Sequence, residues 1–523
     1  MSASIDPHTP VIVGVGQFSE RIDDPDYRGL SAVELATEAA RAALRDCGAD
    51  ATAAARRIDT IAGVRQFEIS TPWATAPLGK STNYPRSVAR RIGASPADAI
   101  LEVVGGQSPQ HLVNEMSAAI AAGERNVVLL LGSEAISTVR HLASADDKPD
   151  LSEVVDGQLN DRGYGLEGMS GPEFVAHGLV DAASQYALLE NARRARLGLT
   201  HEQYRQQMAQ LFAPLSTVAA TNPFAASPVE RNVTELATIT PSNRMIADPY
   251  PRLMVARDQV NQGAAVLVMT VSAASELGVP EDRWVFLHGH ADLRERNLLE
   301  RPDLSRAPSA VSATLEALRV ADVDVDGITT FDLYSCFPIA VSNVLEGLDL
   351  SADDARGLTL TGGLPYFGGA GNNYSMHAIA ETVRAMRERP GSHGLVGANG
   401  GTLSKYSVGI YSTTPRPWRA DRSAALQSEL QARPVAEVAQ VPEGDARIET
   451  YTVRYTKSGP VGIVVGRLDA DDRRFLANPA EGDHDLLDLL IDGEPIGAPI
   501  VVRPDPTGNK AALSTAGIGE CVR

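Results

Sequence analysis

Cysteine is scarce in this sequence. The 523 residues include three, Cys47, Cys336 and Cys521, which are widely separated. Three scattered cysteines are too few for a disulfide framework or a cysteine-rich metal site. We therefore expect no structural metal, and we expect the chain to work in the reducing cytoplasm.

Long apolar runs and excess positive charge are also lacking. No run of about 18 apolar residues occurs, so we expect no membrane span. Residues 1–10 are polar and do not resemble a signal peptide. The formal net charge of −19 repels a phosphate backbone, which argues against a nucleic-acid partner. One basic segment, 191–196, is either a nucleotide-phosphate site or a solvated helix face, and we favour the helix face.

The first third of the chain alternates strand and helix signals. Short apolar runs predict strands, and the Ala-rich stretches between them have helical periodicity. This alternation predicts a layered α/β domain. The predicted strands are 11–15, 58–64, 99–104 and 127–131, and the predicted helices are 30–46 and 108–122.

The middle of the chain, 140–258, is polar and rich in proline, which indicates a long insertion with its own helices. The sheet pattern resumes at 264–269, and a second strand-helix series follows. The two halves therefore suggest one pattern used twice. The second series comprises strands at 284–288, 327–331 and 394–396, and helices at 309–318 and 376–386.

The C-terminal part, from about 426 onward, has a different pattern. Residues 447–455 alternate apolar and polar side chains, as a half-buried strand does. Further short apolar runs at 461–465, 485–491 and 496–502 are separated by turn signals. These features predict a small β-barrel-like domain of about 90 residues.

Five stretches, in the right order, resemble the thiolase superfamily, especially its sterol-carrier type. They are 108–134, 258–268, 331–338, 362–377 and 399–411. The resemblance implies the α/β thiolase fold, with two βαβαβαββ halves in five αβαβα layers and an inserted loop domain. The extra C-terminal domain, for which we expect an OB-like barrel, is similar to that of type-1 thiolase-like proteins.

This resemblance implies a division of the chain into four parts. We expect the N-terminal half at 1–139 and 259–275, the loop domain at 140–258, the C-terminal half at 276–420, and the added domain at 426–523.

A thiolase needs a thiolate nucleophile, an acid–base group and hydrogen-bond donors for developing oxyanions. The resemblance places the nucleophilic cysteine at Gly106 and the water-anchoring Asn or His at Tyr334. It places the histidine of the Gly-His-Pro motif at Gly369 and the second cysteine at Asn399. Glycine offers no nucleophile, and asparagine donates hydrogen bonds without moving protons. Tyr334 either holds a water or lines the cleft.

Two residues are candidate substitutes for the missing groups. His377 follows Gly369 by eight residues, about 11 Å along a helix, so it would need a different loop path. Cys336 lies within a motif, but a buried free cysteine behaves mainly as a small apolar residue. Ser108 is more simply a helix cap than a nucleophile.

The sequence retains glycines whose backbone amides could serve as hydrogen-bond donors to a substrate. The amides of Gly106 and Gly401 could face a thioester oxygen, because helix starts and glycine loops expose unpaired N–H groups. We therefore expect a thiolase-like protein that binds CoA or acyl-CoA thioesters without ordinary thiolysis and without a covalently bound cofactor. The alternative is an acetyl-CoA acetyltransferase-type acyltransferase of lipid metabolism with an altered site. Monomer and homodimer both remain open, and the added domain could recruit a protein partner.

Overall fold

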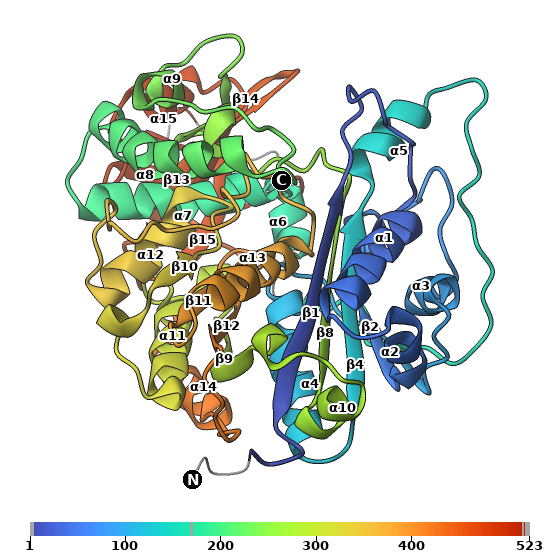
Figure 1. Ribbon diagram of the computed structural model, residues 1–523. Helices are drawn as coiled ribbons and strands as arrows, with labels where there is room; N and C mark the ends of the chain where they lie inside the picture. The colour runs from blue at the N-terminus through green and yellow to red at the C-terminus, as the bar shows by residue number, and fades with distance from the viewer. Residues whose placement is uncertain (1–4, 168–170, 515–516, 518–523) are drawn as a thin grey trace.

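The computed structural model describes residues 5–167, 171–514 and 517, so Cys521 lies outside the described residues. Two α/β halves lie side by side, and the C-terminal domain packs against one of them (Figure 1). Among the described residues, no helix is both long enough and apolar enough to cross a membrane.

The first sheet has six strands in the order β1-β8-β4-β2-β3-β5. Strand β8 is antiparallel to β1 and β4, while β4, β2, β3 and β5 run parallel. The predicted strands of the first third and the run at 264–269 all lie in this sheet. Its strands are β1 (Pro10–Ser19), β2 (Thr60–Gly63), β3 (Asp98–Leu101), β4 (Val127–Glu134), β5 (Asn160–Asp161) and β8 (Gln262–Thr270).

The second sheet repeats four of the six strands of the first. Its order is β10-β11-β12-β9, which matches β2-β4-β8-β1 in the first sheet. Backbone hydrogen bonds between Ile12 and Val285 connect the two sheets. The predicted duplication is therefore confirmed. The strands are β9 (Phe286–Arg294), β10 (Thr330–Asp332), β11 (Gly394–Gly400) and β12 (Lys405–Ser412).

Helices complete five layers, as the thiolase fold requires. Helix α1 (Ala32–Asp46) covers the outer face of the first sheet, and α11 (Pro308–Ala321) covers that of the second. Between the sheets, α4 (Ser108–Ala121) and α13 (Tyr374–Glu388) contact both (Figure 1). The remaining helices of the two halves are α2 (Ala51–Arg57), α3 (Tyr84–Ile92), α10 (Val271–Glu276), α12 (Pro338–Leu348) and α14 (Ser423–Gln431).

The segment between β4 and β8 is mainly helical, but it also adds strands to the C-terminal sheet. Strand β6 pairs with the C-terminal domain at Ala247 and Arg454. Its helices and strands, besides β5, are α5 (Ile136–Leu142), α6 (Pro172–Ala176), α7 (Ala182–Arg196), α8 (His201–Thr221), α9 (Val233–Ala237), β6 (Met245–Ala247) and β7 (Tyr250–Pro251).

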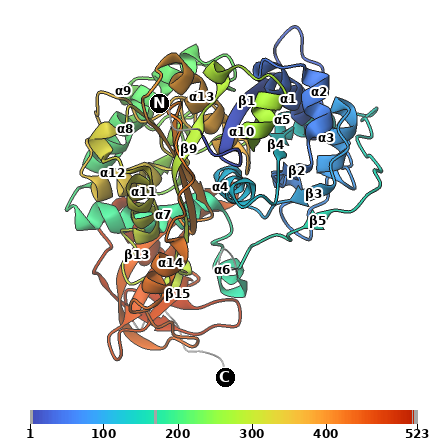
Figure 2. The same cartoon turned by 60° about the horizontal axis from the view of Figure 1, so that its bottom comes forward.

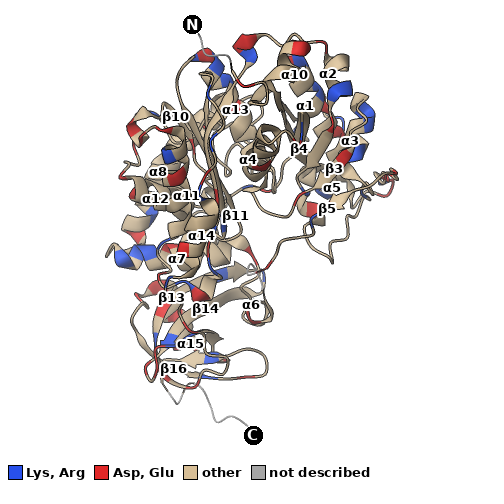
Figure 3. Cartoon of the chain, turned by 90° about the horizontal axis from the view of Figure 1, so that it is seen from below, with Lys and Arg blue, Asp and Glu red and all other residues tan. Residues whose placement is uncertain are grey.

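The basic segment 191–196 is neither a solvated face nor an open phosphate site. Arg193 and Arg194 are buried. Arg193 and Arg196 both pair with Glu346, and Arg194 pairs with Glu494. These arginines bind the insertion to its neighbours. Elsewhere acidic and basic residues are interspersed along the helices (Figure 3).

The C-terminal domain is a closed five-stranded barrel with the order β13-β14-β15-β17-β16 and back to β13. Strand β15 is parallel to β17, and the other pairs are antiparallel. This arrangement confirms the OB-like expectation. The barrel lies against α7 (Figure 2). Its strands are β13 (Gly444–Thr456), β14 (Gly459–Leu468), β15 (Arg474–Pro479), β16 (Pro499–Arg503) and β17 (Lys510–Ala512).

One apolar run grouped with the barrel strands is a helix instead. Residues 485–491 lie in α15 (His484–Asp492), between β15 and β16. Leu486 and Leu490, four residues apart, are its buried face, and the Asp483 carboxylate caps its start. The spacing of four and the acidic cap favour a helix over a strand.

Candidate functional site

Three of the four positions that the family uses for chemistry meet at the start of α4. A β-carbon added to Gly106 would lie 2.0 Å from the hydroxyl oxygen of Tyr334 and 2.6 Å from the carbonyl oxygen of Asn399. The Tyr334 hydroxyl therefore fills the space of the nucleophile's side chain. Burial raises the pKa of Tyr334 well above its usual value, so this phenol is neutral.

Asn399 uses its amide hydrogens inside the protein. Its Nδ2 donates to the Tyr186 hydroxyl and lies 3.8 Å from the sulfur of Cys336. The Tyr186 hydroxyl donates its own proton to the carbonyl of Gly401, at 2.7 Å. Asn399 must therefore present nitrogen to Tyr186. Its oxygen is left buried without a partner among the described residues.

Cys336 is an inert thiol. Its side chain is buried, and burial raises its pKa to about 12. Its polar neighbours are Tyr186 and Asn399, neither of which is a base at neutral pH. No histidine bonds to Cys336 within the described part of the chain.

His377 lies in the core of α13 rather than at the site. Its Nδ1 lies 2.7 Å from Oε1 of Gln17. Nε2 of Gln17 donates to the carboxylate of Glu381, so Gln17 offers oxygen and Nδ1 of His377 holds the proton. Burial, with Arg384 nearby, lowers the pKa of His377 to about 3. His377 is therefore a neutral core histidine.

Gly369 stands apart from the other three positions. Its N–H donates to the carbonyl of Arg257, at 2.7 Å. The atoms nearest to its absent side chain belong to Arg257, Leu364 and Ala256. The structure thus gathers Gly106, Tyr334 and Asn399, and places Gly369 against the insertion.

The two backbone amides singled out in the sequence are unpartnered among the described residues. Neither the N–H of Gly106 nor that of Gly401 donates to a protein acceptor there. Their loops touch, because a β-carbon on Gly400 would lie 3.1 Å from the α-carbon of Gly105. Free amides of this kind stabilise a carbonyl oxygen or an oxyanion.

The prediction that Ser108 caps α4 was wrong. Ser108 is the first helical residue rather than the cap, and its hydroxyl donates to the carbonyl of Val103 at 2.9 Å. The Gln107 side-chain oxygen lies where β-carbons on Gly105 and Gly400 would be, at 2.0 and 1.8 Å. The close contact of Gln107 explains why both positions are glycine.

Tyr186 was also missed. It comes from α7 in the insertion, where no motif marks it, yet it binds Asn399, Gly401 and the N–H of Leu403. Only the folded chain brings this residue to the site.

A groove of about 990 Å³ runs along the insertion beside this site. Arg231, Arg252 and Arg257 line it. Burial lowers the pKa of Arg257; Arg252 and Arg231 also lower it, and Asp258, which lines the groove as well, raises it. Arg231 pairs with Glu235. Arg252 and Arg257 form no ion pair within the described ranges.

The groove adjoins the loops of the site. The N–H of Ala256 donates to the carbonyl of Cys336 at 3.1 Å, and that of Arg257 donates to the carbonyl of Leu364. Only the backbone of residues 256–257 therefore separates a ligand in the groove from the loop that carries Tyr334 and Cys336.

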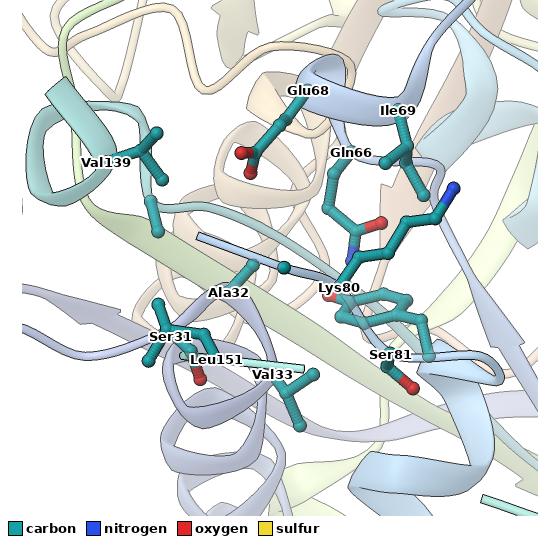
Figure 4. A pocket seen from close by; sticks show the side chains of 13 residues that line it. Ser31, Ala32, Val33, Gln66, Glu68, Ile69, Lys80, Ser81, Val139 and Leu151 are labelled. Carbon is teal, nitrogen blue, oxygen red and sulfur yellow. The ribbon is translucent and has the colours of Figure 1, made fainter. Parts of the chain in front are cut away.

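A second pocket, near the start of α1, is too small for such a ligand. It measures about 40 Å³, and the side chains of Glu68 and Gln66 project into it (Figure 4). Burial raises the pKa of Glu68. This volume suits one or a few water molecules rather than a thioester.

One cluster offers ligands for a metal, but an arginine is bound there. Glu102, His111 and Glu115 place ligand atoms within 4.8 Å of one another. Arg162 donates to Glu102 at 2.6 Å and to Glu115 at 2.6 and 2.7 Å. The guanidinium supplies the positive charge that these carboxylates require.

Comparison with known proteins supports the fold described above. Residues 425–507 match the additional C-terminal domain of thiolase-like protein type 1. No curated protein matches the chain. Two thiolases share only the fold with this chain. Human mitochondrial 3-ketoacyl-CoA thiolase is 17% identical, with 78% of this chain and 100% of that chain covered and a TM-score of 0.55. The dimeric peroxisomal thiolase of Saccharomyces cerevisiae is 14% identical, with 78% of this chain and 98% of that chain covered and a TM-score of 0.57.

A much stronger match is a monomeric SCP2-thiolase like protein type 1 from Mycobacterium smegmatis. It is 55% identical, with 98% of this chain and 100% of that chain covered and a TM-score of 0.84. This protein therefore belongs to the SCP2-thiolase-like proteins of type 1.

Proposed function

We propose that this protein binds CoA and acyl-CoA thioesters and does not perform ordinary thiolysis. The observation that supports this proposal is the pair of unpartnered amides, Gly106 and Gly401, beside a nucleophile position filled by Tyr334. A thioester carbonyl can accept from such amides. Thiolysis also requires a thiolate and a base, and the groups around Gly106 offer neither.

The nucleotide part of CoA would lie in the groove lined by Arg231, Arg252 and Arg257. Guanidinium groups suit phosphates because they form paired, charge-assisted hydrogen bonds. Three arginines line this groove, and two of them, Arg252 and Arg257, form no ion pair with a carboxylate in the described structure. The thioester arm would follow residues 256–257 toward the loop of Tyr334.

The alternative, an acyltransferase of the acetyl-CoA acetyltransferase type, gains no support from the geometry. Cys336 has a raised pKa, and His377 is neutral and bonded to Gln17. Fold-level likeness to thiolases does not carry their chemistry.

We also propose that the protein acts as a cytoplasmic monomer. Strand β5 pairs with the edge of β3 within the same chain, which removes an edge that a second copy could use. The relative from Mycobacterium smegmatis is described as monomeric.

Calorimetric titration with CoA tests the proposal. We expect CoA and acetyl-CoA to bind, and the double variant Arg252→Gln/Arg257→Gln to bind both at least about tenfold more weakly, since charged hydrogen bonds are lost. Arg473→Gln, in the barrel, is the matched control and should bind normally. No binding of CoA by the wild type at millimolar concentration would refute the proposal.

A further inference from the structure

Arg474, on strand β15 of the barrel, connects that domain to the body of the protein. Its side chain is fully buried. Nε and Nη2 bind the barrel residue Glu449 at 2.7 and 2.6 Å. Nη1 donates to the carbonyls of Leu299 and Arg301, at 2.6 and 2.7 Å. One guanidinium therefore holds both the barrel and the segment that follows β9.

A third hydrogen bond to the same segment comes from the chain just before the barrel. The N–H of Ala436 donates to the carbonyl of Glu300 at 3.0 Å. Three consecutive carbonyls, those of residues 299–301, thus accept hydrogen bonds from the chain beyond residue 435. The backbone position of Arg301 depends on these bonds.

Arg301 connects this segment to the site through hydrogen bonds. Its buried guanidinium donates from Nη2 to the carbonyl of Thr402 at 2.7 Å, and from Nε to the carbonyl of Arg296 at 3.0 Å. It forms no ion pair with a carboxylate in the described structure, and Nη1 has no partner there. Nη2 also donates to the Ser404 hydroxyl at 3.3 Å. The orientation of the Arg301 side chain is therefore set by its backbone, by these two carbonyls and by Ser404.

The turn after β11 is held at the two peptide groups that follow the Gly401 amide. Tyr186 accepts from the N–H of Leu403 at 3.1 Å and donates to the carbonyl of Gly401, while Arg301 holds the next carbonyl. Leu403 has a φ of +49°, which a leucine adopts only under constraint. The barrel also supports Tyr186, because Thr450 donates to the carbonyl of Leu188 on α7 at 2.6 Å.

We infer that the C-terminal barrel positions the Gly401 amide for the thioester carbonyl, with Arg474 as the positioning residue and Arg301 as its relay. This inference rests on the proposed function of the site. It assigns the added domain a role within its own chain. Arg474 touches no ligand, so its loss should affect the acyl group and spare the nucleotide part of CoA.

The test compares Arg474→Met/Glu449→Gln with Glu449→Gln alone. The single variant keeps the Nη1 bonds to the two carbonyls, and the double variant removes them. Arg467, the other partner of Glu449, keeps its ion pair with Asp472 in both variants. Hydrogen exchange without ligand is the first readout. We expect the amides of Leu403 and Ser404 to exchange at least tenfold faster in the double variant, and unchanged exchange would overturn the inference.

Ligand binding is the second readout. We expect the double variant to bind acetyl-CoA at least about tenfold more weakly. Its affinity for CoA, which lacks the thioester carbonyl, should stay within twofold. The carbonyl stretch of bound [1-13C]acetyl-CoA should return toward its solution frequency. An unchanged affinity ratio and frequency would contradict the inference. Wild type that binds neither ligand would overturn the proposed function, and the exchange readout would still decide the coupling.

Arg474→Lys covers the case in which the double variant fails to fold. A lysine keeps the charge but cannot bind Glu449 and two carbonyls together. We expect it to fold with an intermediate exchange rate at residues 403–404. Exchange identical to the wild type would count against Arg474 as the positioning residue.

Discussion

The hydroxyl of Tyr334 lies against the α-carbon of Gly106, 2.0 Å from the point where a side chain on that residue would begin. Each residue therefore constrains the other. Glycine is required because the phenol fills the space, and the phenol fits because glycine leaves that space open. A thiolase nucleophile cannot be restored at this position by one substitution.

The first prediction concerns this pair. Gly106→Cys should lower the free energy of unfolding by about 1–3 kcal/mol, because an overpacked core must shift. Combined with Tyr334→Asn, the cysteine should cost less, because the contact with the phenol is lost and only that with the Asn399 carbonyl remains. We expect a favourable coupling of at least about 1 kcal/mol in a double-mutant cycle from urea unfolding. Gly171→Cys is the matched control, since no atom of the described residues, its chain neighbours aside, lies within 4 Å of its absent side chain. Strict additivity would contradict this account.

The second prediction concerns the thiol of Cys336. With a pKa raised to about 12 by burial, it is almost entirely protonated at pH 8. Iodoacetamide should leave this residue unmodified in the native protein and modify it fully in urea, as measured by peptide mass spectrometry. Rapid native labelling of Cys336 would show that the thiol is exposed and activated.

The third prediction concerns pH. The pKa of His377 is about 3 in the folded protein, below its ordinary value of 6.5. Between pH 6.5 and 3 the unfolded chain therefore binds a proton at His377 that the folded chain does not bind. The free energy of unfolding falls as the pH drops through this range.

His377→Gln should remove this contribution. By pH 4.5 the wild type should have lost about 2–3 kcal/mol more than the variant, relative to pH 7.5. Urea unfolding of both proteins across this range measures the difference. Parallel pH curves would mean that His377 is not buried as described.

The fourth prediction concerns Arg162, which follows β5 and binds the buried Glu102. Arg162→Gln should cost about 3–5 kcal/mol of stability, because it leaves Glu102 buried without its guanidinium partner. Adding Glu102→Gln should recover much of that loss. Light scattering should also detect self-association of the single variant, since β5 would no longer be held over the edge of β3. Equal stability of the single and double variants would rule out this role.

Much of the architecture could be predicted because the strands of both sheets are short apolar runs between helices. Helix α15 could not, because a stretch of seven residues with five apolar side chains fits either structure until Leu486 and Leu490 are seen to share one buried face. The pairing of β6 with β13 joins residues about 200 positions apart, which no local pattern shows.

The site was predictable only where motifs mark it. The resemblance indicated Gly106, Tyr334 and Asn399, and these residues do meet. Tyr186 comes from an insertion without a motif, and Arg474 acts through two intervening residues. Burial, which makes His377 and Cys336 unreactive, depends on packing from distant segments and cannot be read from neighbouring residues.

The most direct test of the central claim is a thiolysis assay with acetoacetyl-CoA and CoA, run beside a binding titration on the same preparation. The account predicts saturable CoA binding with no acetyl-CoA formed above the uncatalysed rate. Turnover that alkylation of Cys336 abolishes would contradict it, since a sulfur nucleophile would then be at work in the pocket.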